Sequence, residues 1–349
     1  MSWRNGSCRT TWLDTAKGFA ILGIVLIHAA SWAPGQPSVP AEWILDRLVV
    51  SLPLFFVASG VVGARSLTEE AAGARLVAAR VAPLLYLYIL WQPAVLGYRM
   101  LGDLVLHDRI DLIGELIRFA AAPLRPNGEI WYLWALAIHF VLVWATRRVP
   151  AVLVLGPSFA LFVVLDGWGR TLLGDHLWHV LGPGLQGLPQ FAFFTLIGAR
   201  FAGSIIAMVE RAGLPVIVLV IAGWLAAGRV PSVAPVTVAP LGPVKHLFGV
   251  AAVLLLSRLA DLSTWIAPLR TIGRYSVVPY LTHTAVIVVM LAIAGVVGLL
   301  PVAAAHPTIT TFTLMATASV LVLVVYLPVR STRASLLFTA PARFRVPRP

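Results

Sequence analysis

The stretch "TWLDTAKGFAILGIVLIHAA", residues 11–30, decides how the rest of the chain is interpreted. It predicts a membrane-spanning helix, because a hydrocarbon core about 30 Å thick needs roughly 20 predominantly apolar residues. The same stretch carries Asp14, Lys17 and His28. Ionisable side chains are costly inside a bilayer and often belong to a functional site. We therefore expect this helix both to span the membrane and to take part in the protein's chemistry.

The composition of the whole chain also predicts a membrane protein. Of its 349 residues, 59% are hydrophobic and only 11% are charged, whereas about a quarter of the residues are charged in a typical soluble domain. The first apolar run is not a cleavable signal peptide, because it carries charges and "SWAPGQPSVP" follows it without a small-residue cleavage pattern. We expect an all-α, polytopic integral membrane protein, with one transmembrane domain over residues 1–335 and a basic cytoplasmic tail over residues 336–349.

Ten segments are apolar and long enough to be transmembrane helices. They cover about residues 12–33, 44–64, 76–98, 129–146, 150–166, 189–209, 213–229, 243–259, 273–299 and 308–329. Ten spans place both termini on the same side of the membrane. If that side is the cytoplasm, 18 of the 26 basic residues lie on it, as the positive-inside rule requires. We therefore expect a multi-pass protein of the cell (plasma or inner) membrane with cytoplasmic N- and C-termini.

The net charge of +12 follows from this orientation. The arginines are scattered singly between apolar spans, so we expect no nucleic-acid partner. We expect the basic tail to bind anionic membrane lipid. Between the third and fourth spans, "DLIGELIRFAAAPL" (residues 111–124) has apolar and charged residues at helical spacing, which predicts an amphipathic helix along the outer interface.

The sequence offers little for a metal ion. Cys8 is the only cysteine, which excludes an internal disulfide and a cysteine-rich metal site. His176 and His179 are spaced i, i+3 beside Asp175 in a predicted outer loop. A structural or catalytic zinc site needs at least three protein ligands, and no third strong ligand stands near this pair, so we expect no metal.

Helix geometry relates the ionisable residues of the first span to one another. Lys17 and His28 are eleven residues apart, so they share a face to within roughly 20° and lie about 16 Å apart along the axis. Asp14 is one turn before Lys17 and can pair with it. The alternatives are an interfacial ion pair with a snorkelling lysine and, for His28, an interhelical hydrogen bond.

This pattern of a basic residue, ten residues and a histidine resembles the membrane acyltransferase-3 family, which includes O-antigen acetylases and fucose 4-O-acetylase-like enzymes. The family usually has an arginine where Lys17 stands, and many sugar-acetylase relatives have a histidine where Ser51 stands. Further segments fit the family in the same order: "SLPLFFVASG" (51–60), "RLVAARVAPLLY" (75–86), "GEIWYLWAL" (128–136) and "GRYSVVPYLTH" (273–283). The resemblance covers nearly all ten spans.

The resemblance implies an O-acyltransferase that moves an acyl group, in the first place acetyl, from cytoplasmic acyl-CoA to a hydroxyl group of a sugar, a surface glycan or a glycosylated metabolite. Cations at cytoplasmic helix ends can bind the phosphates of the coenzyme. His28 is the expected catalytic residue, either as general base or as transient acyl carrier; we favour the base. The residues expected to hold the donor are Lys17, Arg75, Arg80 and Arg274.

The residues expected on the substrate side are polar or aromatic and lie near the predicted outer helix ends or on a face shared with His28. They are Asp14, Ser59, Glu129, Trp131, Tyr132, Tyr280 and His283. Each has an alternative role in structure alone: close helix packing for Ser59, an aromatic belt for Trp131 and Tyr132, and the helix dipole for Glu129. For Tyr280 and His283 the alternative is hydrogen bonding to a neighbour, and His139 is expected to be structural.

Two other classes of function remain open from the residues alone. Ten helices with few intramembrane charges also suit a transporter or flippase for a polar or lipid-linked solute. No pair of broken helices at matching positions in the two halves favours that class. A membrane scaffold has no use for a lysine and a histidine on one helical face. Binding of acyl-CoA, seen as a raised melting temperature, discriminates between these classes.

Overall fold

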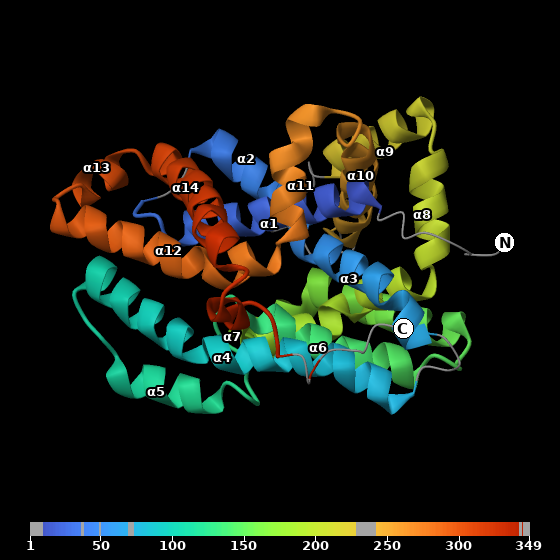
Figure 1. The fold of residues 1–349 in the computed structure, drawn as a ribbon, viewed down its shortest axis with the longest axis horizontal. Helices are drawn as coiled ribbons and strands as arrows, with labels where there is room; N and C mark the ends of the chain where they lie inside the picture. The colour runs from blue at the N-terminus through green and yellow to red at the C-terminus, as the bar shows by residue number, and fades with distance from the viewer. Residues whose placement is uncertain are drawn as a thin grey trace.

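The computed structural model describes residues 10–35, 38–48, 50–68, 73–227, 242–341 and 344. Cys8 and the end of the predicted tail lie outside these residues. Every regular element in the described part of the chain is a helix (Figure 1), so the expected all-α fold is confirmed. The elements are α1 (Thr11–Trp32), α2 (Val39–Leu48), α3 (Ser51–Thr68), α4 (Ala74–His107), α5 (Leu112–Ala121), α6 (Trp131–Ala145), α7 (Ala151–Arg200), α8 (Ala202–Arg211), α9 (Leu214–Ala227), α10 (Gly242–Ala260), η2 (Thr264–Ile266), α11 (Ala267–Arg274), α12 (Val277–Val296), α13 (Leu300–Ala305), α14 (Pro307–Val329) and η3 (Arg333–Leu337).

Seven helical segments among the described residues are long and apolar enough to cross a membrane, or eight if the bent pair α8 and α9 forms one span. The molecule is thus a multi-pass membrane protein. Helix α7 is one of these seven segments, although it covers the fifth predicted span and most of the sixth. Its backbone leaves helical geometry at Gly174 and Gly182. Helix α6 is the shorter apolar helix at the fourth predicted span. Ten crossings and cytoplasmic termini stay predictions.

The sixth predicted span, 189–209, differs from the structure because the helix breaks after Arg200. The Arg200 guanidinium donates to the carbonyl oxygens of Arg147 at 3.1 Å and of Val149 at 3.2 Å. These bonds fix the end of α7 against the loop that precedes it. The chain then continues as α8, and α8 and α9 meet at an angle of 109°.

Helix α1 lies at the centre of the bundle and contacts α3, α10, α11, α12 and α14. Small residues allow the closest of these contacts. A Cβ atom on Gly18 would collide with the backbone of Leu269 in α11, and one on Gly273 would collide with the backbone of Asp14. Helix α11 is therefore held against the first half of α1, close to Lys17.

A second packed region joins α3, α6 and the last part of α7. The Phe56 ring lies 5.4 Å from the Phe191 ring and 6.2 Å from the Trp131 ring, measured between centroids. Aromatic pairs at such distances stabilise beyond the area that they bury. At Gly60 and Gly198 the backbones of α3 and α7 touch, so that a Cβ atom on either would collide with the other helix.

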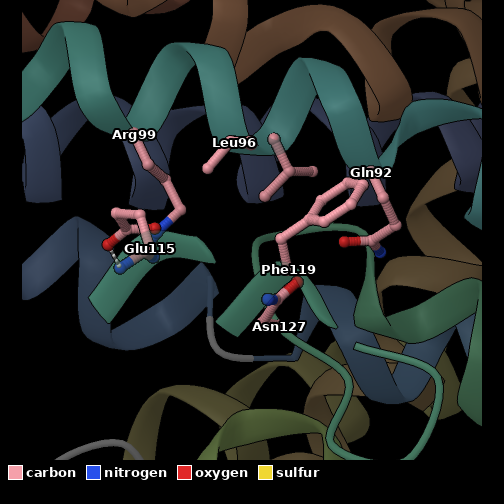
Figure 2. Close-up of a pocket in the computed structure, with 7 residues that line it drawn as sticks. Gln92, Leu96, Arg99, Glu115, Phe119 and Asn127 are labelled. Carbon is pink, nitrogen blue, oxygen red and sulfur yellow. Dashed lines mark hydrogen bonds and ion pairs between the residues drawn. The ribbon is translucent and has the colours of Figure 1, made fainter. Parts of the chain in front are cut away.

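The loop between α4 and α6 contains helix α5, as the sequence predicts. The Asp111 carboxylate caps it by accepting from the amide of Gly114 at 3.0 Å, and its apolar side chains, such as Ile113 and Ile117, are exposed. Helix α4 runs beyond its predicted end and presents Arg99 to α5 (Figure 2). There Arg99 donates to the buried carboxylate of Glu115 at 2.8 and 3.1 Å.

The start of the predicted tail packs along α4. The Tyr86 hydroxyl donates to the carbonyl oxygen of Leu336 at 3.1 Å, and the Trp91 indole donates to that of Leu337 at 2.7 Å. The Phe338 ring lies 5.7 Å from the Trp91 ring. The residues that follow α14 are thus part of the packed structure in this region.

Candidate active site

Two histidines from distant helices meet inside the bundle. The rings of His28 in α1 and His283 in α12 have centroids 5.1 Å apart. His283 is buried, and its Nδ1 atom lies 2.8 Å from the carbonyl oxygen of Pro279. Its Nε2 atom has no hydrogen-bond partner, whereas the His28 side chain keeps some accessible surface. The predicted face of the first span therefore points at a second imidazole.

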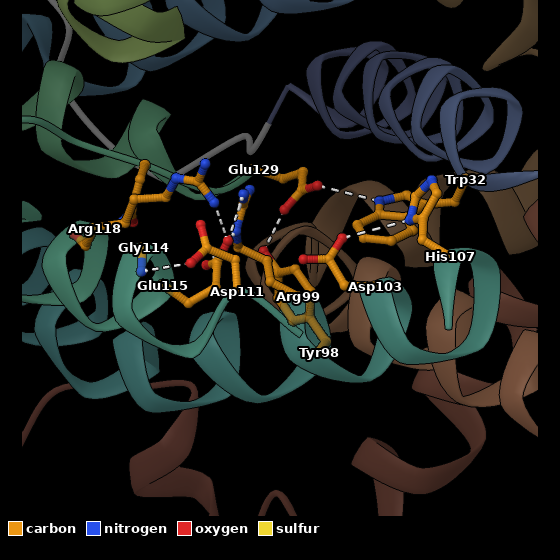
Figure 3. Close-up of polar contacts among 11 residues, drawn as sticks. Trp32, Tyr98, Arg99, Asp103, His107, Asp111, Gly114, Glu115, Arg118 and Glu129 are labelled. Carbon is orange, nitrogen blue, oxygen red and sulfur yellow. Dashed lines mark hydrogen bonds and ion pairs between the residues drawn. The ribbon is translucent and has the colours of Figure 1, made fainter. Parts of the chain in front are cut away.

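Glu129, just before α6, completes a cluster with these histidines. Its carboxylate interacts electrostatically with His28 and His283. The Trp32 indole donates to Glu129 Oε1 at 3.3 Å, and the Tyr98 hydroxyl donates to Oε2 (Figure 3). Each carboxylate oxygen is thus held by a donor from a different helix, and hydrogen bonds to a charged group are the stronger kind. The segment before α6 fixes a negative charge beside two imidazoles.

Two further tyrosines, Tyr280 and Tyr132, contact this segment or its neighbours. The Tyr280 hydroxyl donates to the backbone oxygen of Glu129 at 2.6 Å, and its ring lies 5.5 Å from the Tyr132 ring. The Tyr132 hydroxyl lies 2.6 Å from Ser59 Oγ. The predicted substrate-side residues Ser59, Tyr132, Tyr280 and His283 therefore form one connected group around Glu129.

Trp131 and His139 lie in the aromatic core instead. The Trp131 ring packs against the stacked rings of Phe56 and Phe191. His139 Nδ1 lies 2.9 Å from Thr195 Oγ1, and its Nε2 lies 2.7 Å from the carbonyl oxygen of Leu188. Both His139 nitrogens are thus used in packing, the role that the sequence predicts for this residue.

At the other end of α1, Lys17 pairs with Asp14. Lys17 Nζ lies 2.7 Å from Asp14 Oδ1, one turn away, and the ammonium keeps some exposure. Arg274 is exposed at the end of α11, above the Tyr275 ring at 5.7 Å. Because α11 packs on the first half of α1, Arg274 and Lys17 belong to the same end of the bundle. Asp14 lies here, away from the histidines.

The remaining predicted donor-binding residues lie at the start of α4. Arg75 is exposed, and Arg80 Nε donates to Ser66 Oγ at 2.9 Å. Figure 1 shows the start of α4, the end of α3 and the start of α1 toward the same end of the longest axis. Arg75 and Arg80 thus lie at the start of α4, where Arg80 bonds to α3, while Lys17 lies on α1 and Arg274 on α11.

For metal ions, the described residues contain no group of three or more histidine, cysteine, aspartate or glutamate side chains arranged to bind one. His179 Nδ1 lies 2.6 Å from the carbonyl oxygen of Asp175, so the two are joined by a local backbone contact. His176 is exposed on α7.

The sequence did not single out Trp32 and Tyr98. Both are aromatic residues with a polar tip near a predicted helix end, which is the default for an aromatic belt. Their spacing contains no signal that they meet Glu129. One general rule points toward them: a buried carboxylate needs hydrogen-bond donors, and an indole and a phenol can supply these.

Comparison with known proteins supports the family that the motifs resemble. Residues 10–328 match the family model for the acyltransferase domain of the acyltransferase-3 family. The matched segment includes His28, Glu129 and His283. No curated protein and no solved structure matches the chain.

Proposed function

The chain belongs to the acyltransferase-3 family, and on this premise we propose that it transfers an acetyl or other acyl group from cytoplasmic acyl-CoA to a hydroxyl group of a sugar, a surface glycan or a glycosylated metabolite. The observation that carries the proposal is the meeting of His28, His283 and Glu129. Such a cluster of imidazoles and a carboxylate suits proton transfer to and from an attacking hydroxyl.

In the proposed reaction, neutral His28 takes the proton of the acceptor hydroxyl while the oxygen attacks the carbonyl carbon of the thioester. The carbon–sulfur bond breaks, the new ester forms, and the proton on His28 passes to the departing thiolate, so that free coenzyme A leaves. The Glu129 carboxylate stabilises the transient imidazolium by its charge. Trp32 and Tyr98 hold Glu129 in place, which makes them positioning residues.

The donor is proposed to enter from the end of the bundle that carries Lys17, Arg75, Arg80 and Arg274, which we take as the cytoplasmic side. Cations there neutralise the phosphates of the coenzyme. The rise from Lys17 to His28 is about 16 Å, similar to the reach of an extended pantetheine arm. The thioester then comes to the histidine cluster while the nucleotide stays at the surface.

The test is to supply radiolabelled acetyl-CoA to membranes with and without the protein, and to analyse all extracted glycans and lipids. The proposal expects one class of hydroxyl-bearing molecule to become labelled only when the protein is present. Absence of any protein-dependent label, with acyl-CoA failing to raise the melting temperature of the purified protein, would refute it.

A further inference from the structure

Asp261, in the turn that follows α10, binds three side chains from two other helices. Its Oδ1 atom accepts from the Thr15 hydroxyl at 3.1 Å, and its Oδ2 atom accepts from the Thr11 hydroxyl. The Arg270 guanidinium lies 2.6 Å from Oδ1 and also donates to the Asp261 carbonyl oxygen at 3.2 Å. Both carboxylate oxygens therefore have partners, and these partners come from α1 and α11. We call these four residues the Asp261 network.

The Asp261 network is well placed to hold helices together. Thr11 and Thr15 are four residues apart, so they lie on one face of α1, and Thr15 is fully buried. The Asp261 side chain is only 15% exposed. Partly buried charges are screened less by salt than surface charges, and hydrogen bonds to a charged group are the stronger kind. The network thus fastens α11 and the turn before it to the start of α1.

The same two helices also touch backbone to backbone. A Cβ atom on Gly18 would come 2.2 Å from the carbonyl oxygen of Leu269, and one on Gly273 would come 1.7 Å from that of Asp14. Glycine allows this close approach because it has no Cβ atom, but for the same reason it provides no side-chain bond across the contact. The Asp261 network supplies side-chain bonds that keep the two backbones together.

Two of the cations that we propose for the donor flank this backbone contact. Lys17 directly precedes Gly18 and pairs with Asp14 at 2.7 Å. Arg274 directly follows Gly273 at the end of α11. A shift of α11 along α1 therefore changes the spacing between these two cations. Asp261 is itself an anion, which repels a phosphate, so it can act on the donor only through the cations that it places.

We infer that Asp261 is a positioning residue of the donor site, which holds α11 against α1 at the spacing at which Lys17 and Arg274 bind the phosphates of acyl-CoA. The inference rests on the proposed function and adds to it a residue outside the histidine cluster. A site whose cations are already in place loses less binding free energy to ordering them. Loss of the network therefore weakens donor binding and leaves the chemical step at the histidine cluster unchanged.

The kinetic test uses the full-length protein with Asp261→Asn, which keeps the size of the side chain but removes the charge that pairs with Arg270. The acceptor is the molecule that becomes labelled in the radiolabelled acetyl-CoA experiment. We expect the KM for acyl-CoA to rise about tenfold, whereas kcat and the acceptor KM stay unchanged. Arg270→Gln should raise the same KM, and the double variant should be no worse than either single variant, because the two residues act as one unit.

Asp46→Asn is the matched control. Asp46 lies in α2, and its carboxylate pairs at 2.8 Å with Lys245 at the start of α10. The substitution thus removes an ion pair between helices at the opposite end of α10 from Asp261. It should lower the melting temperature, as Asp261→Asn does, but leave the KM for acyl-CoA at the wild-type value.

Donor binding is measured independently by titration calorimetry of coenzyme A into the purified protein. The Kd of Asp261→Asn should be about tenfold weaker than that of the wild type, and the Kd of Asp46→Asn should equal it. Because Arg270 is a third exposed, Arg270→Gln decides the question if Asp261→Asn does not fold.

An unchanged Kd and KM for the donor in the folded variant overturns the inference, and so does a fall in kcat with the KM unchanged, because the network would then serve the fold alone. Equal binding by wild type and variant overturns only the inference. Failure of the wild type itself to bind coenzyme A refutes the proposed function and the inference with it.

Discussion

His28 in α1 and His283 in α12 lie with their ring centroids 5.1 Å apart. The two helices are far apart in the sequence, so the contact exists only because α1 is central and α12 packs against it. Glu129 interacts electrostatically with both rings. This arrangement turns a motif on one helix into a site built from three segments.

His28→Ala should lower kcat for acyl transfer by about 10²–10⁴, the usual contribution of a positioned general base. The melting temperature should change little, because the His28 side chain keeps some accessible surface. The measurement is the rate of coenzyme A release with acceptor present. His306→Ala, at an exposed histidine between α13 and α14, is the control. A His28→Ala rate equal to wild type would contradict the base role.

Lys17→Gln should raise the KM for acyl-CoA about tenfold, because a charge-assisted bond to phosphate is lost, with a smaller effect on kcat. Lys17→Arg keeps the charge and should stay near wild type. Titration calorimetry with coenzyme A checks the same loss as a weaker Kd. Equal affinity in Lys17→Gln and wild type would remove Lys17 from the donor site.

The histidine cluster could be predicted only in part from the sequence. Helix periodicity predicts that Lys17 and His28 share a face. The resemblance of residues 273–283 to a family motif indicates that His283 belongs to the site. The sequence does not predict the hydrogen bonds from Trp32 and Tyr98 to Glu129, because these bonds join α1, α4 and the segment before α6. Spacing within one helix contains no information about which residue of another helix it meets.

The helices themselves were predicted well where the apolar run is continuous, as in α1, α10 and α14. The predicted and observed helix bounds differ where a glycine or a contact with a loop determines where a helix bends or ends. Helix α7 continues through the predicted loop between two spans and bends at Gly174 and Gly182. Helix α4 extends past its predicted end, where Arg99 pairs with Glu115 of α5 and Asp103 pairs with His107 one turn further along α4.

Gly60→Ala should destabilise the protein by about 1–3 kcal/mol, as expected when a side chain is forced into a packed contact. The added methyl group would collide with the backbone of α7 at Thr195 and Gly198. Thermal melting of the detergent-solubilised protein measures the effect. Gly97→Ala is the matched control, since a Cβ atom there has no neighbour within 4 Å. Equal melting temperatures for both variants would contradict the close contact between α3 and α7.

Glu115 should make stability depend on acid pH. Its pKa is held below the usual 4.5 by Arg99 and Arg118 despite burial, so its ion pairs stabilise the fold fully above the usual pKa and are lost as pH falls through the lowered one. Melting temperatures of wild type and Glu115→Gln are compared from about pH 7 down to about pH 3. The wild type should be the more stable protein at neutral pH, and the difference should shrink in acid. A difference independent of pH would show that the ion pairs are not its cause.

The coupling between His28 and Glu129 tests the central claim most directly. The value of kcat for acyl transfer is measured for the wild type, His28→Ala, Glu129→Gln and the double variant; the amide keeps the size of the side chain and removes its charge. If Glu129 acts by stabilising the His28 imidazolium, Glu129→Gln slows the wild type but has no further effect once His28 is gone. The account predicts a double variant as fast as His28→Ala. Losses that multiply would show that the two residues act separately and would contradict it.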